Sequence, residues 1–209
     1  MLGPLLFIIY INDIMDSLSS KIYLFADDTK LFRVIRSEDD CKFLQSDIDK
    51  LLEWSQTWLL SFHPNKCKVL HVGTDQEPTN YYLNTHQLQN VNSEKDIGVT
   101  FDCNLEFDIH ISEKISKANS IFGMIRRSYK YLNKDVFLLL YKALVRSNLE
   151  YANSVWSPHK MKHIEAIENV QRRATRTVQC LKGLSYEDRL RYLNLHTSNI
   201  FSVFSFRST

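Results

Sequence analysis

The sequence lacks the features that mark secreted, disulfide-stabilised proteins. No Cys-x-x-Cys pair and no Asn-x-Ser/Thr sequon occurs in its 209 residues. The cysteines are widely spaced, which indicates free thiols in a reducing compartment. They are Cys41, Cys67, Cys103 and Cys180. We therefore expect an intracellular protein and leave open whether it resides in the nucleus or the cytoplasm.

Long apolar runs, internal repeats and low-complexity tracts are also missing. The apolar run at residues 5–11 is far shorter than a bilayer-spanning helix, and no basic segment precedes it. We expect this run to form a buried helix and expect no membrane partner. Hydrophobic content of 44% and charged content of 24% are ordinary for a globular protein with one domain or two small ones.

Charge is unevenly distributed although the net charge is only +2. Residues 1–102 hold nine Lys and Arg against fifteen Asp and Glu, a net charge of −6, whereas residues 103–209 hold seventeen against nine, a net charge of +8. An acidic half and a basic half fit a metal-binding domain joined to a phosphate-binding one. Many helical domains are basic without binding nucleic acid, so the charge pattern supports this interpretation without proving it.

Two adjacent carboxylates, Asp27 and Asp28, follow an apolar segment and precede another. Residues 22–25 and 30–34 have strand character, which places the pair at the tip of a tight hairpin. Neighbouring carboxylates repel unless a divalent cation sits between them and another acid, and Mg²⁺ prefers such oxygen ligands. The alternative from the residues alone is a solvated Asp-Asp turn.

A zinc site is the other metal site that the spacing suggests. His63, Cys67 and His71 are four residues apart, but they straddle a loop and a strand and are one ligand short of a structural zinc site. We expect no zinc there.

The segment after the hairpin has helical spacing. Ser37 with Asp40 three residues later marks a helix start, and apolar residues recur at three and four through residues 41–59. The charged residues between them, Asp47 included, are expected on the solvated face. The pattern predicts an amphipathic helix lying on a sheet.

Later segments divide into strands and then helices. Residues 66–72 and 97–101 have strand character, with Gly98 inside the second strand, where glycine marks a bulge or a close backbone approach. From His110 onward three apolar stripes at helical spacing predict a bundle. We therefore predict an α+β fold, in which an antiparallel sheet with packed helices precedes an all-α bundle.

The motifs around the acidic pair resemble the reverse transcriptases of LINE-type, non-LTR retrotransposons. Phe25-Ala26-Asp27-Asp28 resembles their polymerase motif C. The other similarities follow in the family's order: Leu2-Gly3-Pro4-Leu5-Leu6-Phe7 and Tyr10-Ile11-Asn12-Asp13 (motif B), Trp54, Trp58 and residues 60–67 (motif D), Lys95-Asp96-Ile97-Gly98-Val99 (motif E), and residues 141–151, Trp156 and residues 170–176 (the segment after the palm).

The resemblance implies a role for each motif. Residues 1–105 would be the C-terminal part of a polymerase palm and residues 106–209 a thumb-like helical domain. Asp27 would be the principal Mg²⁺ ligand and Asp28 its weaker neighbour. Lys66 would protonate departing pyrophosphate or neutralise its charge, unless it is merely an exposed lysine at a strand edge. Gly98 would lie in the primer grip, unless it is a bulge without function.

The same resemblance implies nucleic-acid partners, namely an RNA template, a DNA primer and, in the intact family, a deoxynucleoside triphosphate. Arginines on the predicted helices are candidates for contacts with phosphate, although a solvated face is an equally good explanation for any one of them. They are Arg126, Arg127, Arg172, Arg173 and Arg176.

Three hypotheses about function follow. The chain is part of an RNA-directed DNA polymerase, or a nucleic-acid-binding remnant without catalysis, or a transposon relic that does not fold stably because its apolar N-terminal helix lacks partners. Salt-dependent binding of an RNA/DNA hybrid without nucleotide incorporation favours the second, and a broad thermal transition favours the third.

We predict that the 209 residues alone do not extend a primer. In the family the third carboxylate of the metal site comes from motif A, and Asp13 and Asp16 lie on the predicted helix and its end rather than on a strand. Loss of one ligand from a highly charged metal pair should lower activity more than tenfold. A primer-extension assay with Mg²⁺ checks this, and template-dependent incorporation that Asp27→Asn abolishes would contradict it.

Overall fold

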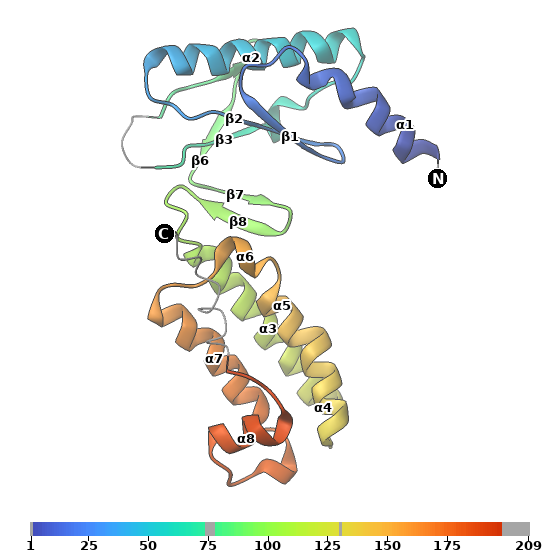
Figure 1. Ribbon diagram of the computed structural model, residues 1–209, viewed down its shortest axis with the longest axis vertical. Helices are drawn as coiled ribbons and strands as arrows, with labels where there is room; N and C mark the ends of the chain where they lie inside the picture. The colour runs from blue at the N-terminus through green and yellow to red at the C-terminus, as the bar shows by residue number, and fades with distance from the viewer. Residues whose placement is uncertain (1, 74–77, 130, 198–209) are drawn as a thin grey trace, which may run out of the picture. The chain divides into compact units, whose positions relative to one another are not determined.

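The computed structural model describes residues 2–73, 78–129 and 131–197. Helices and short strands are both present, which confirms the α+β class. The chain forms two compact units, residues 1–92 and 93–209, coloured blue to green and green to red in Figure 1. None of the described helices is both long and apolar enough to cross a membrane. The assignment of residues 1–105 to a palm and 106–209 to a thumb stays a prediction.

Short paired strands and helices build the first unit. β1 pairs antiparallel with β2 and β4 with β5, whereas β3 pairs parallel with β6. The described strands thus form separate pairs and not the single antiparallel sheet that was predicted, because most contain only two or three residues and each pairs with one neighbour. In order, the elements are α1 (Leu2–Ile11), the 3₁₀ helix η1 (Asn12–Met15), β1 (Lys21–Phe25), β2 (Asp28–Phe32), α2 (Glu38–Thr57), the 3₁₀ helix η2 (Pro64–Lys66), β3 (Lys68–Leu70), β4 (Tyr82–Leu83), β5 (His86–Gln87) and β6 (Gln89–Val91).

The predicted hairpin is formed by β1 and β2, with the two acids at its tip. Phe25 faces Asp28 in the last residue pair, so Ala26 and Asp27 make a two-residue turn and Asp28 begins β2. Ala26 has a φ of 53°, a left-handed conformation that costs a residue with a Cβ atom about 1 kcal/mol. The turn is therefore strained, and contacts elsewhere in the unit must stabilise it.

Helix α2 starts as predicted, but its charged face is not fully solvated. Ser37 and Asp40 form a capping box, with the Ser37 amide donating to the Asp40 carboxylate at 3.1 Å. Asp47, predicted on the solvated face, is completely buried. Periodicity misplaced it because the loop before β1, residues 19–20, covers that side of the helix.

The buried carboxylate of Asp47 joins α2 to the hairpin. It accepts hydrogen bonds from the Ser19 amide at 3.1 Å, the Ser19 hydroxyl at 2.8 Å and the Ser20 amide at 2.7 Å. Lys50 Nζ lies 3.1 Å away, and Arg33, directly after β2, lies 3.9 Å away. Burial opposes ionisation, but these hydrogen bonds outweigh it and hold the pKa of Asp47 well below its usual value. The residues on either side of the hairpin are thus fixed to one helix.

Helix α1 forms but is not buried, contrary to the prediction. Ile8 and Ile9 are 59% and 64% exposed, and no residue of α1 is buried. Phe7 and Ile11 are half-buried, and at the C-terminal end the Tyr10 ring packs edge-on against Trp58 with centroids 5.1 Å apart. The sequence predicted burial from apolar composition, and composition does not say which surface covers a helix.

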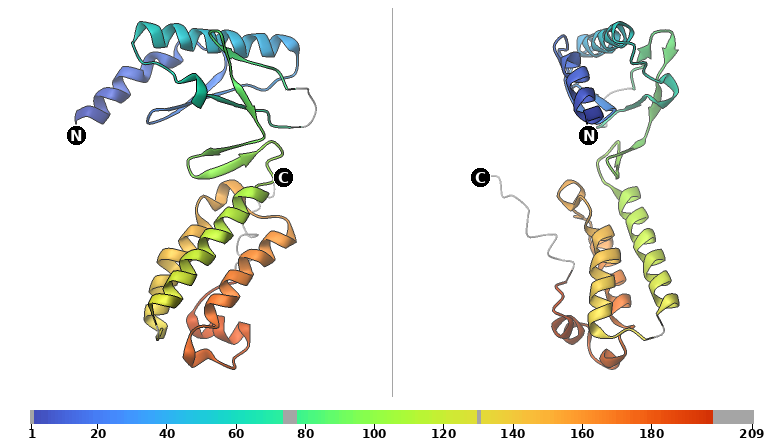
Figure 2. Two further views of the ribbon diagram at one scale, coloured as in Figure 1. Left: turned by 180° about the vertical axis from the view of Figure 1, so that it is seen from behind. Right: turned by 90° about the vertical axis from the view of Figure 1, so that its right-hand side faces the viewer.

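The second unit packs helices around an apolar core. α3 lies against α7 and against the η3–α5 segment, as the two views in Figure 2 also show. The three predicted apolar stripes are confirmed as α3, the continuous α4–α5 run and α7, whereas α8 was not predicted. The elements are β7 (Ser93–Asp96), β8 (Val99–Asp102), α3 (Asp108–Ser128), α4 (Lys134–Leu140), the π-helix η3 (Tyr141–Arg146), α5 (Ser147–Glu150), α6 (Asn153–Trp156), α7 (Met161–Thr175), the 3₁₀ helix η4 (Gln179–Leu181) and α8 (Tyr186–Leu193).

A buried amide connects three of these helices. Gln171 of α7 accepts a hydrogen bond from the Tyr141 hydroxyl at 2.9 Å and donates to the Tyr186 hydroxyl at 3.1 Å and to the His196 carbonyl at 2.9 Å. A buried amide is stable only when its donors and its acceptor are satisfied. This network therefore fixes α8 against α7.

We predict that Asp47→Asn destabilises the first unit by about 3 kcal/mol, because the change removes the negative charge that compensates buried donors and nearby cations. Urea unfolding followed by a probe in residues 1–92 measures the effect. Asp49→Asn is the matched control, since Asp49 is exposed on the same helix and accepts a hydrogen bond from Gln45. Its effect should stay within about 0.5 kcal/mol, and equal effects of the two changes would contradict the role of Asp47.

Candidate functional site

The two carboxylates at the tip of the β1–β2 hairpin are exposed to solvent. Within the described residues, none donates a hydrogen bond to the carboxylate of Asp27 or Asp28 and none forms an ion pair with these carboxylates. The strained turn thus keeps two like charges side by side without a compensating cation. Such a pair is available to a cation from solution.

The chemistry of these donors fits Mg²⁺ that keeps most of its water. Mg²⁺ is commonly bound through one or two carboxylates, with water and phosphate oxygens completing six ligands. Across residues 2–73, 78–129 and 131–197, no group of three His, Cys, Asp or Glu side chains converges to hold a metal. Asp27 and Asp28 therefore fit as part of a Mg²⁺ site rather than as a closed cage.

Lys66 lies in a 3₁₀ turn and not in the strand predicted for residues 66–72. It is the last residue of η2, its amide donates to the His63 carbonyl at 2.9 Å, and its side chain is exposed. Pro64 explains the difference, because its fixed φ favours the first turn of a helix over a strand. No interaction among the described residues links Lys66 to Asp27 or Asp28.

Gly98 is part of a tight turn and not of a strand interior, contrary to the prediction. Asp96 pairs with Val99 at the end of the β7–β8 hairpin, so Ile97 and Gly98 form a two-residue turn. Their φ values, 42° and 78°, are both positive, as a type I′ turn requires. The turn was not predicted from the sequence, because a β-branched residue such as Ile97 rarely adopts a positive φ.

A buried histidine fastens this hairpin to α3. His110 is fully buried, and its Nδ1 accepts a hydrogen bond from the Thr100 amide of β8 at 3.1 Å. Its ring lies edge-on to Trp156, with centroids 5.2 Å apart. Burial, with a smaller contribution from the positive charge of Lys114, lowers the pKa of His110 to about 4. The histidine is therefore neutral at physiological pH and acts as an acceptor for the strand.

Three of the five predicted arginines converge on one hollow in the second unit. Arg126 comes from the last turn of α3, Arg173 from the last turn of α7, and Arg176 follows α7 directly. They line a hollow of about 510 Å³. None of the three forms an ion pair within the part of the chain that the structure describes. The other lining residues are Asn119, Phe122, Gly123 and Thr177.

The remaining predicted arginines lie outside this lining, and the structure adds one that the sequence did not indicate. Arg127 is exposed on α3, and Arg172 lies 5.0 Å from the centroid of the Tyr186 ring. Arg189 lies 5.6 Å from the same centroid and is 6% exposed. Burial and the charges of Arg176 and Arg172 lower the pKa of Arg189. The spacing of Tyr186 and Arg189 by three residues on α8 is the signal that could have suggested their contact.

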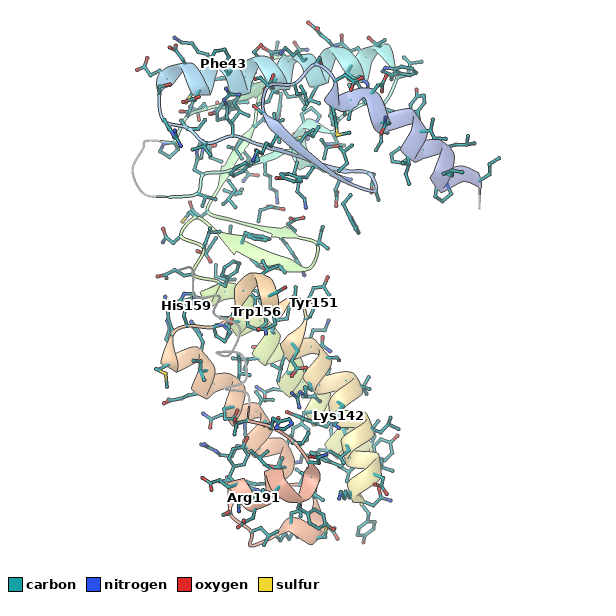
Figure 3. The ribbon with its side chains drawn as sticks, in the orientation of Figure 1. Phe43, Lys142, Tyr151, Trp156, His159 and Arg191 are labelled. Carbon is teal, nitrogen blue, oxygen red and sulfur yellow. The ribbon has the colours of Figure 1, made fainter. Side chains whose placement is uncertain are left out.

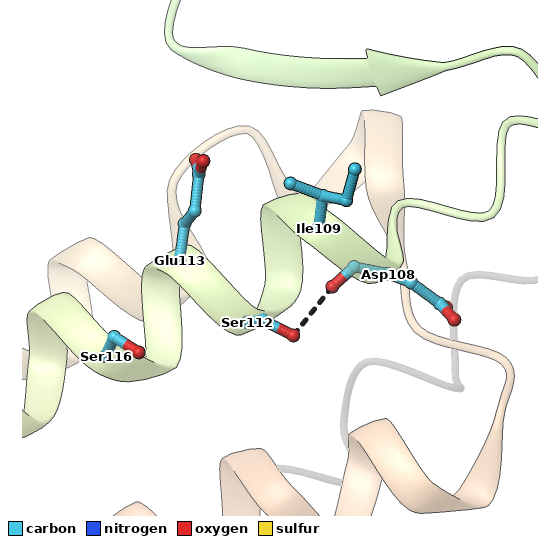
Figure 4. Close-up of a pocket in the computed structure, with 5 residues that line it drawn as sticks. All are labelled: Asp108, Ile109, Ser112, Glu113 and Ser116. Carbon is cyan, nitrogen blue, oxygen red and sulfur yellow. Dashed lines mark hydrogen bonds between the residues drawn. The ribbon is translucent and has the colours of Figure 1, made fainter. Parts of the chain in front are cut away.

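A second hollow, of about 610 Å³, is open and lies along one face of α3 (Figure 4). Asp108, at the start of the helix, is not available to a ligand, because its carboxylate contacts Lys162 at 2.9 Å and His163 at 2.6 Å. These hydrogen bonds hold the pKa of Asp108 well below its usual value. Asp108 therefore serves to tie α3 to α7. The lining residues are Asp108, Ile109, Ser112, Glu113 and Ser116.

The histidine and cysteine considered for zinc have other surroundings. His71 stacks with Tyr81 at a centroid distance of 6.3 Å and contacts the Asn90 side chain at 3.2 Å. Burial raises the pKa of the Cys67 thiol, which disfavours the thiolate that zinc requires.

Comparison with known proteins identifies related sequences. A family model described as reverse transcriptase (RNA-dependent DNA polymerase) matches residues 1–135. A Drosophila melanogaster protein named as a probable RNA-directed DNA polymerase from transposon X-element is 26% identical over 189 residues, which are 85% of this chain and 21% of that protein. An uncharacterised protein of Caenorhabditis elegans is 27% identical over 106 residues, 49% of this chain and 54% of that protein. The chain thus spans about a fifth of the first relative and about half of the second. No solved structure matches it.

We predict that His110 makes stability depend on pH in a window above the carboxylate range. The unfolded imidazole has a pKa near 6.5 and the folded one about 4, so the unfolded state binds more protons between these values and stability is lost as pH falls. Urea unfolding at pH 7 and pH 5 should show a loss that is smaller by about 2 kcal/mol in His110→Gln than in the wild type. His159→Gln, at an exposed histidine, should match the wild type. Equal pH dependence of all three proteins would contradict the prediction.

Proposed function

The chain belongs to the reverse transcriptase family, in its LINE-type, non-LTR branch, and we propose that it binds an RNA/DNA hybrid by placing arginines on the phosphate backbone. The family match covers residues 1–135, and the alignment with the transposon X-element protein extends over most of the remainder. RNA-directed DNA synthesis requires both a template and a primer. A hybrid of the two is therefore the partner whose chemistry fits the basic second unit.

The convergence of Arg126, Arg173 and Arg176 on one hollow is the observation on which this proposal rests. They come from two helices far apart in the sequence and share no carboxylate partner among the described residues. Because all three line the same hollow, an anion bound there would be attracted by three positive charges. Arginine also matches phosphate geometry with two parallel hydrogen bonds, which suits backbone recognition.

We also assign a role to each of the two parts of the chain, following the family to which it belongs. Residues 1–105 act as the C-terminal part of a palm and residues 106–209 as a thumb-like domain. The β7–β8 hairpin, with Gly98 in its turn, takes the position of the primer grip. That this hairpin is packed on α3 through His110 supports a unit in which grip and thumb move together.

For catalysis in the intact family, Asp27 and Asp28 are the carboxylates that would hold Mg²⁺, which supplies electrostatic stabilisation of the phosphates when bound. Asp27 lies in the turn and Asp28 at the start of β2, so the hairpin presents both oxygen donors to solvent. Lys66 would need to approach the pyrophosphate to neutralise it. Its exposed position in η2 leaves its ammonium group accessible for that role.

The alternative is a nucleic-acid-binding remnant that does not catalyse. The observation that favours it is the lack, within the described residues, of a third acid beside Asp27 and Asp28. Hybrid binding without incorporation distinguishes this alternative from an active enzyme. In either case we expect an intracellular location, which the separated cysteines support.

We predict that the full chain binds an RNA/DNA hybrid with a strong salt dependence that requires the hollow. Replacing both Arg173 and Arg176 with Gln should reduce the slope of log Kd against log[salt] by about two and weaken binding at least tenfold, because each arginine releases about one counterion from the hybrid. Fluorescence anisotropy at salt concentrations from about 50 to 200 mM measures both the Kd and its slope against salt.

Arg191→Gln is the matched control for this experiment. Arg191 lies on α8 of the same unit, is exposed and is already within 3.6 Å of Asp188, so its loss should leave affinity within about twofold. Hybrid binding that does not depend on salt, or equal losses in the control and the double variant, would contradict the proposal.

A further inference from the structure

A hydrogen bond joins the β7–β8 turn to the helical part of the second unit. The Tyr151 hydroxyl donates to the Ile97 carbonyl at 2.9 Å, across 54 residues of sequence. Tyr151 lies between α5 and α6, and Figure 3 shows it with Trp156 at the end of the helical segment near the β7–β8 hairpin. The contact therefore connects the tip of the hairpin directly to the bundle.

Strained backbone flanks this hydrogen bond on both sides. Ile97, whose carbonyl accepts it, has a φ of 42°, and Ala152, which follows Tyr151, has a φ of 53°. Each left-handed residue with a Cβ atom costs about 1 kcal/mol or more, and β-branching makes Ile97 the less favourable of the two. Such strain persists where surrounding contacts determine the conformation, and it clusters at functional sites.

The Tyr151 ring also fits closely against the turn. A Cβ atom added to Gly98 would lie 3.1 Å from Cε1 of the ring and 3.4 Å from its hydroxyl oxygen. Glycine at position 98 thus suits both the φ of 78° and the close approach of the ring, which a Cβ atom would force to shift.

The tyrosine itself is held from behind by the core. The Trp156 indole donates to the Tyr151 carbonyl at 2.7 Å, and Trp156 is 1% exposed. Trp156 packs on His110, which accepts the hydrogen bond from Thr100 of β8. Tyr151 thus contacts the tip of the hairpin and His110 contacts β8. Trp156 touches both of these residues.

Charged side chains of both signs lie near the turn, which directly follows Glu94, Lys95 and Asp96. Lys114 Nζ lies 4.8 Å from the centroid of the Tyr151 ring. Burial lowers the pKa of Lys114, and the charges of Lys117 and Lys95 add to this effect. The neighbouring acid, Glu113, accepts a hydrogen bond from the Thr100 hydroxyl at 3.2 Å. Lys114 therefore places a positive charge beside the Tyr151 ring.

We propose that Tyr151 is a positioning residue, which holds the Ile97–Gly98 turn in the shape that contacts the 3′ end of a DNA strand in an RNA/DNA hybrid. This inference rests on the proposed function, because it names the part of the hybrid that the hairpin meets. The Tyr151 hydroxyl bonds the turn, and the residue is not part of the core, since it is 45% exposed. Phenylalanine at this position would keep the packing and lose the hydrogen bond.

The experiment uses the full chain and a hybrid whose DNA strand has a recessed 3′ end with 2-aminopurine as its last base. A second dye at the opposite end reports total binding by anisotropy. Wild-type protein should change the 2-aminopurine fluorescence when bound. Tyr151→Phe should lose at least half of that change while its Kd stays within about twofold, because the arginine hollow still binds the duplex.

Two further variants sharpen the comparison. Gly98→Ala should act like Tyr151→Phe, since its Cβ would displace the ring. Tyr192→Phe is the matched control, because Tyr192 is also half exposed and also has a lysine, Lys134, 4.5 Å from its ring centroid. Without nucleic acid, hydrogen exchange at the Gly98 and Val99 amides should be about fivefold faster in Tyr151→Phe and unchanged in the control.

The outcomes separate this inference from the proposed function. If wild-type protein does not bind the hybrid, the proposed function is wrong and the inference fails with it. If the protein binds but the 2-aminopurine signal is absent, or persists in Tyr151→Phe, the inference alone is overturned. Loss of the signal with unchanged affinity and faster exchange at the turn supports it.

Discussion

The position of the acidic turn depends on one buried carboxylate, that of Asp47. The turn is strained at Ala26 and the carboxylates of Asp27 and Asp28 repel each other, so the β1–β2 hairpin depends on support from the rest of the unit. That support comes from α2, where Asp47 binds the amides of Ser19 and Ser20 just before β1 and lies near Arg33 just after β2. A single ionised side chain thus fixes both ends of the hairpin, and the donors that surround it keep it ionised.

In the second unit it is positive charge, not negative charge, that is concentrated at one place. Arg126, Arg173 and Arg176 line one hollow and form no ion pair within the described residues, and Arg172 and Arg189 lie against the ring of Tyr186. Packing on an aromatic ring and the Gln171 network hold this region in place, so the positive charge is kept available for a ligand. One half of the chain therefore exposes carboxylates to a cation, and the other exposes guanidinium groups to an anion. Reverse transcriptases need both ligands, metal ions and nucleic acid.

Local signals in the sequence predicted the elements that depend on neighbouring residues. The β1–β2 hairpin, the capping box of Ser37 and the three apolar stripes of the second unit are all set by residues close in sequence. Features set by distant partners were missed. The burial of Asp47 depends on a loop 27 and 28 residues away, and the exposure of α1 depends on surfaces that its own composition cannot reveal. Gly98 was placed on a strand because Ile97 hides the turn, which Tyr151 stabilises from 54 residues away.

We propose, as the claim on which the rest depends, that the hairpin tip of this chain also binds a divalent cation through Asp27 and Asp28. Adding Mn²⁺, which takes the same oxygen ligands as Mg²⁺, to isotopically labelled protein tests it directly by paramagnetic broadening of backbone amide signals. The account predicts that amides of residues 25–29 broaden first and that Asp27→Asn and Asp28→Asn each weaken this effect, while amides of α2 remain sharp. Broadening that centres elsewhere in the chain, or that both substitutions leave unchanged, would contradict the account.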